Sequence, residues 1–180
     1  MTTAEDSFDF YNRLRAFVGF DASDEARLKA IGPLLVPEQP RITDQFYEAI
    51  LGEPETAAFV EGRVEELKKT HARWFTELFS GVYDQTYFTN RWAIGKAHVR
   101  IGLSPRWVDL VFTIILQEVS EALTKSPVED PEAARRSMAK ILELDRAVIQ
   151  LAYDEDRLDR LSDFTGMKRA LIENVVRIAR

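Results

Sequence analysis

Apolar residues recur three or four positions apart along almost the whole chain, and this spacing most constrains its fold. Residues at that separation share one face of an α-helix, so each such stretch predicts a helix with one buried side. The 180 residues include 8 glycines and 7 prolines, few enough for long helices joined by short loops. We therefore predict an all-α protein.

Capping and turn residues divide the chain into expected helices. Asp24 is the expected N-cap of the second helix, which Gly32-Pro33 could interrupt. No repeat, low-complexity tract or flexible linker is visible, which predicts one domain over 1–163 followed by a final segment over 164–180. The expected helices span 4–18, 24–35, 40–51, 54–79, 85–101, a stretch beginning at Pro105, 130–161 and 167–178.

Composition excludes several classes of function. A net charge of -6 without a block of Lys and Arg argues against nucleic acid or a membrane surface as a partner. The absence of cysteine excludes disulfides, iron–sulfur clusters, a catalytic thiol and covalently attached haem. No apolar run reaches the roughly 18 residues that span a bilayer, and the N-terminus lacks a secretory signal. We expect a cytoplasmic protein.

The two histidines, His71 and His98, both fall on apolar helix faces, where a polar ring needs a partner. One interpretation is a hydrogen-bonded core histidine, and the other is a ligand. Carboxylate-rich metal sites in helical bundles use Glu-x-x-His pairs, but Lys68 and Gly95 stand three residues before these histidines. Haem needs only one neutral imidazole and an apolar slot, and the sequence supplies both.

The segment Ile94–Trp107, which reads IGKAHVRIGLSPRW, closely resembles the proximal signature of bacterial globin-coupled sensors and their single-domain, protoglobin-like relatives. The resemblance covers roughly residues 10–155. It implies a globin fold with an extra N-terminal helix and no short D-type helix, holding haem b without a covalent bond. Further matching segments, in the same order along the chain, are 18–20, 46–51, 78–81, 83–84 and Tyr87.

The resemblance assigns roles to residues on both sides of the haem. His98 matches the proximal iron ligand, and Tyr47 matches a distal tyrosine whose hydroxyl can donate to bound dioxygen in preference to CO. Thr70 matches a small polar distal residue in some relatives, and Leu67 matches an apolar lining residue. Trp107 is expected in the apolar slot.

Some assignments near the haem stay open. Val108 stands where relatives often have tyrosine, so control on the proximal side is expected to differ. His71 either takes the sixth iron position or packs near a haem edge, leaving the iron five-coordinate. The local candidates to bind the haem propionates are Arg91, Lys96 and Arg100, although a solvated helix face is the favoured interpretation of each.

Three functions remain to be separated. The resemblance favours a sensor that binds O2, and possible further ligands NO and CO, and signals as a homodimer through the helices that begin near Pro105 and Asp130. Residues 164–180 would then be a C-terminal helix or the start of a connector to an output domain. An enzyme that handles O2 or NO would need a separate reductase, because no flavin or NAD motif is visible. A haem-free interaction module is the third hypothesis.

Overall fold

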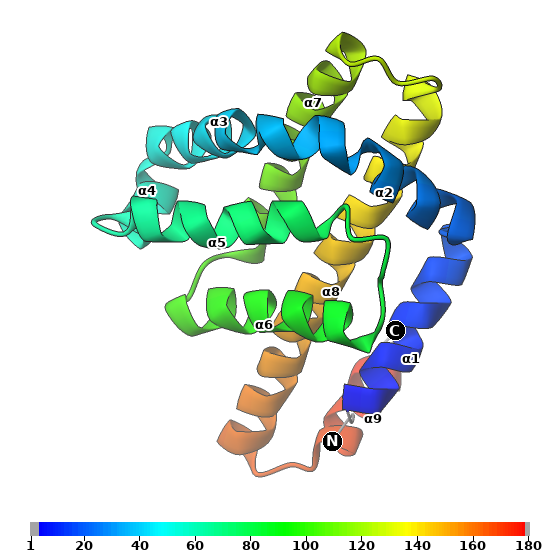
Figure 1. The fold of residues 1–180 in the computed structure, drawn as a ribbon. Helices are drawn as coiled ribbons and strands as arrows, with labels where there is room; N and C mark the ends of the chain where they lie inside the picture. Colours follow the sequence, from blue (N-terminus) through cyan, green and yellow to red (C-terminus); the bar gives the residue numbers. More distant parts are fainter. Residues whose placement is uncertain (1–3, 179–180) are drawn as a thin grey trace.

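The computed structural model describes residues 4–178, and within them every regular element is a helix (Figure 1). This confirms the predicted all-α class. A single 3-10 turn, Val36–Glu38, separates the second helix from the third. The α-helices are α1 (Ala4–Phe17), α2 (Ala22–Leu35), α3 (Gln39–Gly52), α4 (Pro54–Val60), α5 (Val64–Glu77), α6 (Gln85–Ile101), α7 (Pro105–Lys125), α8 (Pro131–Thr165) and α9 (Arg169–Ile178).

The second helix differs from its expected form at both ends. The N-cap is Asp21 rather than Asp24, because Asp21 has an extended backbone and its carboxylate accepts the amides of Ser23 and Asp24. Asp24 lies at the third helical position and completes a capping box. The helix also continues through Pro33 without a break, so the expected interruption at this point is wrong.

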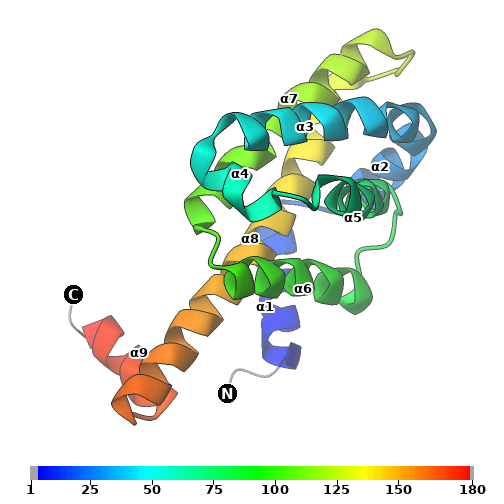
Figure 2. The same ribbon diagram turned by 90° about the vertical axis from the view of Figure 1, so that its left-hand side faces the viewer.

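The expected long helix over 54–79 is two helices, α4 and α5. Gly62 has a φ of +71°, a left-handed conformation that an α-helix cannot include and that glycine adopts at little cost. Figure 2 shows how α4 connects α3 with α5. In contrast, α8 is longer than expected and ends at Gly166, whose φ is +68°. The boundary between 163 and 164 therefore falls within α8.

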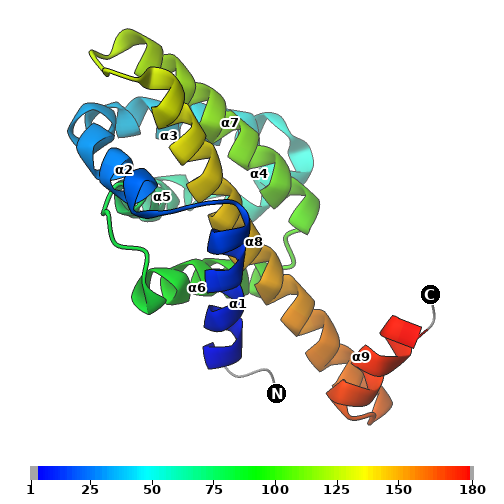
Figure 3. The same cartoon turned by 90° about the vertical axis from the view of Figure 1, so that its right-hand side faces the viewer.

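Helices α3, α5 and α6 lie across the paired helices α7 and α8 (Figures 1 and 3). Helices α6 and α8 approach each other closely at Gly95 of α6, where an added Cβ would stand 2.6 Å from the Cβ of Ala152 and 2.9 Å from the carbonyl oxygen of Ile149. Only glycine lets the two backbones meet at this separation. This contact sets the position of α6, and with it the position of His98.

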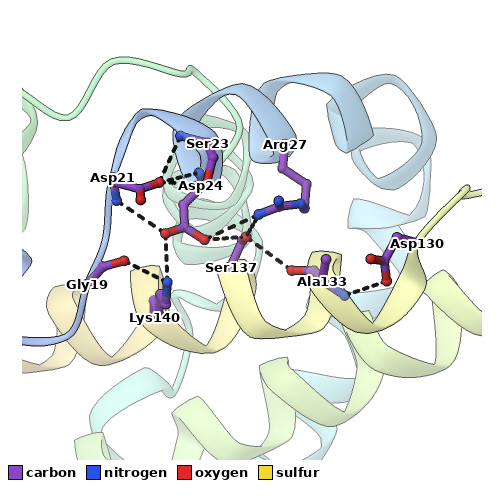
Figure 4. Close-up of polar contacts among 9 residues, drawn as sticks. All are labelled: Gly19, Asp21, Ser23, Asp24, Arg27, Asp130, Ala133, Ser137 and Lys140. Atoms are coloured by element: carbon purple, nitrogen blue, oxygen red, sulfur yellow. Dashed lines mark hydrogen bonds and ion pairs between the residues drawn. The ribbon is translucent and has the colours of Figure 1, made fainter.

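A buried polar cluster holds α2 against α8 (Figure 4). Asp24 is 3% exposed, and its Oδ2 lies 2.8 Å from Nζ of Lys140. The hydroxyl of Ser137 donates to Oδ1 of Asp24 at 2.6 Å, and Lys140 also donates to the carbonyl of Gly19 at 2.7 Å. Because both carboxylate oxygens are bonded, burial of the charge is compensated.

At the other end of the molecule, α9 turns back along α8 (Figure 3). Arg169 pairs with Glu155 of α8 at 2.5 Å, and Ile172 is buried. These contacts attach the final helix to the rest of the chain. Among the helices in the described part of the chain, none combines the length and the apolar character needed to cross a membrane.

Candidate functional site

A cavity of about 460 Å³ opens between α3, α5, α6 and α7, within the range of roughly 300–1,000 Å³ that small-molecule sites occupy. Its lining is mainly apolar and aromatic. The structure brings all of the sequence-predicted site residues to its wall, although they lie on four different helices. These residues are Tyr47, Leu67, Thr70, His71, His98 and Trp107.

His98 reaches the cavity from the last turn of α6. This helix begins at Asp84, whose carboxylate caps two backbone amides, and ends at Gly102 in a left-handed conformation. Nδ1 of His98 is buried and has no hydrogen-bond partner among the described residues. Burial lowers the pKa of His98 to about 4, so the ring is neutral at pH 7. A neutral imidazole is the form that binds a metal ion.

Tyr47 comes from α3 and is 6% exposed. Burial raises the pKa of its phenol to about 12, so the hydroxyl keeps its proton and remains a donor. The ring lies edge-on to the ring of His71, with centroids 6.1 Å apart. Tyr47 therefore brings a protonated hydroxyl group to the same cavity as His98.

His71 of α5 is held firmly on the cavity wall. Its Nδ1 lies 2.8 Å from Oγ1 of Thr43, whereas its buried Nε2 has no partner within residues 4–178. The ring stacks on Phe46 at 4.4 Å and lies 5.2 Å from the ring of Trp74. Burial lowers the pKa of His71 to about 4, so this ring is also neutral.

The other predicted site residues differ in how far they are buried. Thr70 lines the cavity but is exposed, and its hydroxyl donates to the carbonyl of Glu66 at 3.2 Å. Leu67 and Trp107 are half-buried and add apolar surface. Sequence reasoning missed Thr43, although its position four residues before Tyr47 places both on one face of α3.

One candidate for binding the haem propionates was wrong. Arg91 is fully buried, and its Nε donates to Oδ2 of Asp145 at 2.9 Å. A second nitrogen of its guanidinium pairs with Glu77. Arg100 does line the cavity, as does Arg63, which the sequence analysis did not single out. Lys96 instead lies over the ring of Trp92, 5.7 Å from its centroid.

The pair of Arg91 and Asp145 belongs to a polar cluster that joins three helices beside the cavity. Asp145 of α8 accepts a hydrogen bond from the hydroxyl of Tyr87 at 2.7 Å and another from the indole of Trp74 at 2.8 Å. Trp74 also forms part of the cavity wall next to His71. The indole therefore connects the cavity directly to α8.

The observed residues fit the haem b that the sequence predicts. An apolar slot receives a macrocycle, and a neutral imidazole on the wall supplies an iron ligand. His98 and His71 each have a buried ring nitrogen without a partner among the described residues, which is rare for core histidines. The cysteine-free chain would hold the group without a covalent bond.

Comparison with known proteins agrees with this fold. A family model described as protoglobin matches residues 10–175. The globin domain of a Geobacter sulfurreducens globin-coupled sensor is 32% identical, with a TM-score of 0.74 over 79% of this chain and 96% of that domain. The chain belongs to the protoglobin family. The match extends beyond residue 155, where the recognised motifs ended.

Two other proteins are similar to this chain. The heme-based aerotactic transducer HemAT of Halobacterium salinarum is 28% identical over 174 residues, which are 89% of this chain and 36% of the transducer. The chain thus spans about a third of that relative. The ferric globin domain of E. coli DosC shares the fold, with a TM-score of 0.64 at 18% identity over 78% of this chain and 97% of that domain.

Proposed function

We propose that this chain is a haem-based gas-binding and gas-sensing globin of the cytoplasm, with O2 as its main ligand and NO and CO as others. One observation carries the proposal: His98, Tyr47 and His71 approach a single apolar cavity from three helices. The relatives support it, since one is a heme-based transducer and another is the globin domain of a sensor. Haem supplies the iron at which a diatomic gas binds reversibly.

His98 is the proposed proximal ligand. Its ring is neutral, and we assign Nε2 to the iron, which leaves the ring proton on Nδ1, a buried atom without a partner within the described residues. A hydrogen bond at Nδ1 normally increases the basicity of a metal-bound histidine. We therefore expect His98 to be a weaker electron donor to iron than a proximal histidine that has this bond.

Tyr47 is the proposed distal donor. Its hydroxyl is protonated and lies in a mainly apolar cavity, where a hydrogen bond to a polar ligand is stronger than in bulk solvent. Dioxygen gains more from such a donor than CO does. Leu67 and Trp107 exclude water from the slot, and Thr70 lies at its exposed edge. His71 has two candidate roles, as sixth iron ligand or as an uncoordinated neighbour.

Signal output is proposed to pass through α7 and α8 in a homodimer. Trp74 connects the cavity wall with Asp145 of α8, so displacement of the wall would alter the packing of α8. We propose that residues 164–180, which include α9, form a C-terminal helix or lead into an output segment.

Absorption spectra of the haem-reconstituted chain test the proposal in the ferric, ferrous and CO-bound states. We expect reversible binding of O2 and CO, and loss of the specific haem bands in His98→Ala. The matched control is Lys96→Ala, which changes a residue on the same helix that does not line the cavity. A parent chain that binds no haem would contradict the proposal and favour an interaction module.

A further inference from the structure

A chain of hydrogen bonds leads from α3 to the distal histidine. The amide nitrogen of Gln39 donates to Oγ1 of Thr43 at 2.5 Å, and Oγ1 of Thr43 lies 2.8 Å from Nδ1 of His71. Thr43 is 2% exposed, so water does not compete for these bonds. None of the proposed roles of the pocket residues accounts for this chain of contacts.

The hydroxyl proton of Thr43 has one acceptor. Gln39 already donates to the oxygen, and no further hydrogen bond of this side chain is found within residues 4–178. Other helical threonines, such as Thr70 and Thr76, donate to the carbonyl four residues earlier, but Thr43 does not. The hydroxyl proton of Thr43 is satisfied only if the hydroxyl donates to Nδ1 of His71.

This direction determines the tautomer of the ring. A neutral imidazole that accepts at Nδ1 carries its own proton on Nε2. The ring is also confined, because it stacks on Phe46 at 4.4 Å and contacts Trp74 on the adjacent turn. Nε2 is the ring atom that has no protein partner among the described residues. The proton on Nε2 is therefore free for a ligand in the cavity.

We propose that Gln39 and Thr43 hold His71 with its proton on Nε2, so that His71 donates a hydrogen bond to a gas ligand beside Tyr47 instead of coordinating the iron. Thr43 is then a positioning residue. Only an unprotonated ring nitrogen binds a metal ion, so His71 must move its proton from Nε2 to Nδ1 before it can coordinate. The bond with Thr43 then reverses, and the hydroxyl proton of Thr43 loses its acceptor. This inference rests on the proposed function and deepens it.

The first test is the coordination state of ferrous haem in Thr43→Val, which removes the hydroxyl and keeps the shape of the side chain. The ratio of six-coordinate to five-coordinate haem should rise about fivefold, the equilibrium factor for one hydrogen bond. Thr43→Ser keeps the hydroxyl and should resemble the parent. Adding His71→Ala to Thr43→Val should abolish the six-coordinate fraction.

The second test reads the tautomer directly by 15N NMR of the histidine rings in the purified chain, with and without haem and CO. The chain has only 2 histidines, so His71→Ala assigns the signals. In the parent, we expect the proton of His71 on Nε2. In Thr43→Val, we expect it to exchange between the two ring nitrogens.

Three results would overturn the inference: a parent proton on Nδ1, a parent ferrous haem that His71 already coordinates, or a Thr43→Val spectrum and tautomer identical to those of the parent. Failure of the proposed function is a separate outcome, because it appears as absence of haem binding. In that case the NMR experiment on the haem-free chain still decides which nitrogen carries the proton.

Discussion

Substitution of Gly95 by alanine tests whether the close contact of α6 with α8 positions the proximal helix. An alanine Cβ would lie 2.6 Å from the Cβ of Ala152 and 2.9 Å from the backbone oxygen of Ile149. Side-chain rotation cannot relieve either contact, because one atom is a Cβ and the other belongs to the backbone. The two helices must therefore move apart.

The expected magnitude follows from two opposing effects. Overpacking of a close contact lowers the free energy of unfolding by about 1–3 kcal/mol, whereas replacing glycine by alanine within a helix raises it by about 1 kcal/mol. Both contacts of the added Cβ are shorter than 3.0 Å, so the upper part of the first range, about 2–3 kcal/mol, applies. We therefore expect the free energy of unfolding to fall by about 1–2 kcal/mol. For a domain of this size, such a loss lowers the Tm by roughly 2–8 °C. Movement of α6 should also alter the haem spectrum through His98.

Urea unfolding followed by far-UV circular dichroism, with and without haem, measures this change. Gly52→Ala is the matched control, because nothing lies within 4 Å of the added Cβ. The control should leave stability unchanged or raise it by about 0.4–1 kcal/mol. Ala152→Gly should partly rescue Gly95→Ala, because it removes the nearest atom. If Gly95→Ala is as stable as the parent, the argument from the close contact is refuted.

Three other measurements test the buried polar groups. Folding lowers the pKa of His71 from 6.5 to about 4, so the unfolded chain binds more protons in that interval and stability of the haem-free protein rises with pH across it. The contribution of His71, about 3 kcal/mol, is complete above the unfolded pKa and lost near pH 4. Burial lowers the pKa of His98 to about 4 as well, so His71→Gln should remove about half of the dependence that the two histidines produce. Asp145→Ala removes the fully buried partner of Arg91 and the shared acceptor of Tyr87 and Trp74, and leaves only Glu77 to pair with the buried guanidinium. It should lower the free energy of unfolding by about 3–5 kcal/mol. Asp109 of α7, which is 43% exposed and pairs with Arg146, is the matched control. Asp109→Ala should cost at most about 1 kcal/mol, and equal losses would contradict this ranking. Tyr47→Phe should raise the O2 dissociation rate about tenfold to a hundredfold while changing CO dissociation much less, as stopped-flow spectroscopy can measure. Equal effects on both gases would exclude the hydroxyl as a selective donor.

Local signals in the sequence predicted most helices to within a few residues. The errors occur where a backbone conformation, rather than hydrophobic spacing, decides the boundary. Gly62 adopts a left-handed conformation and splits the expected helix over 54–79, although the apolar pattern continues across it. Asp21 and Asp24 are both acceptable caps, and only the extended backbone at Asp21 selects it.

The candidate residues of the site were predicted by motif, and their surroundings were not. His98 and Tyr47 could be named because their neighbours in the chain match those of a known family. Arg91 was misread because a basic residue on a helix surface and one in a buried ion pair look alike in sequence. Its partner, Asp145, lies 54 residues away, and the periodicity of one helix does not reveal which other helix it will meet.

The sequence by itself determined the helical class, the family, the absence of covalent haem attachment and the identity of the two histidines. These properties depend on residue type and on spacing within one segment, which the linear chain records. Tertiary structure alone decided that Thr43 reaches Nδ1 of His71, that Nδ1 of His98 has no described partner, and that Trp74 joins the cavity to Asp145. Each of these facts depends on the distance between atoms of different helices, which only the packing of the whole chain sets.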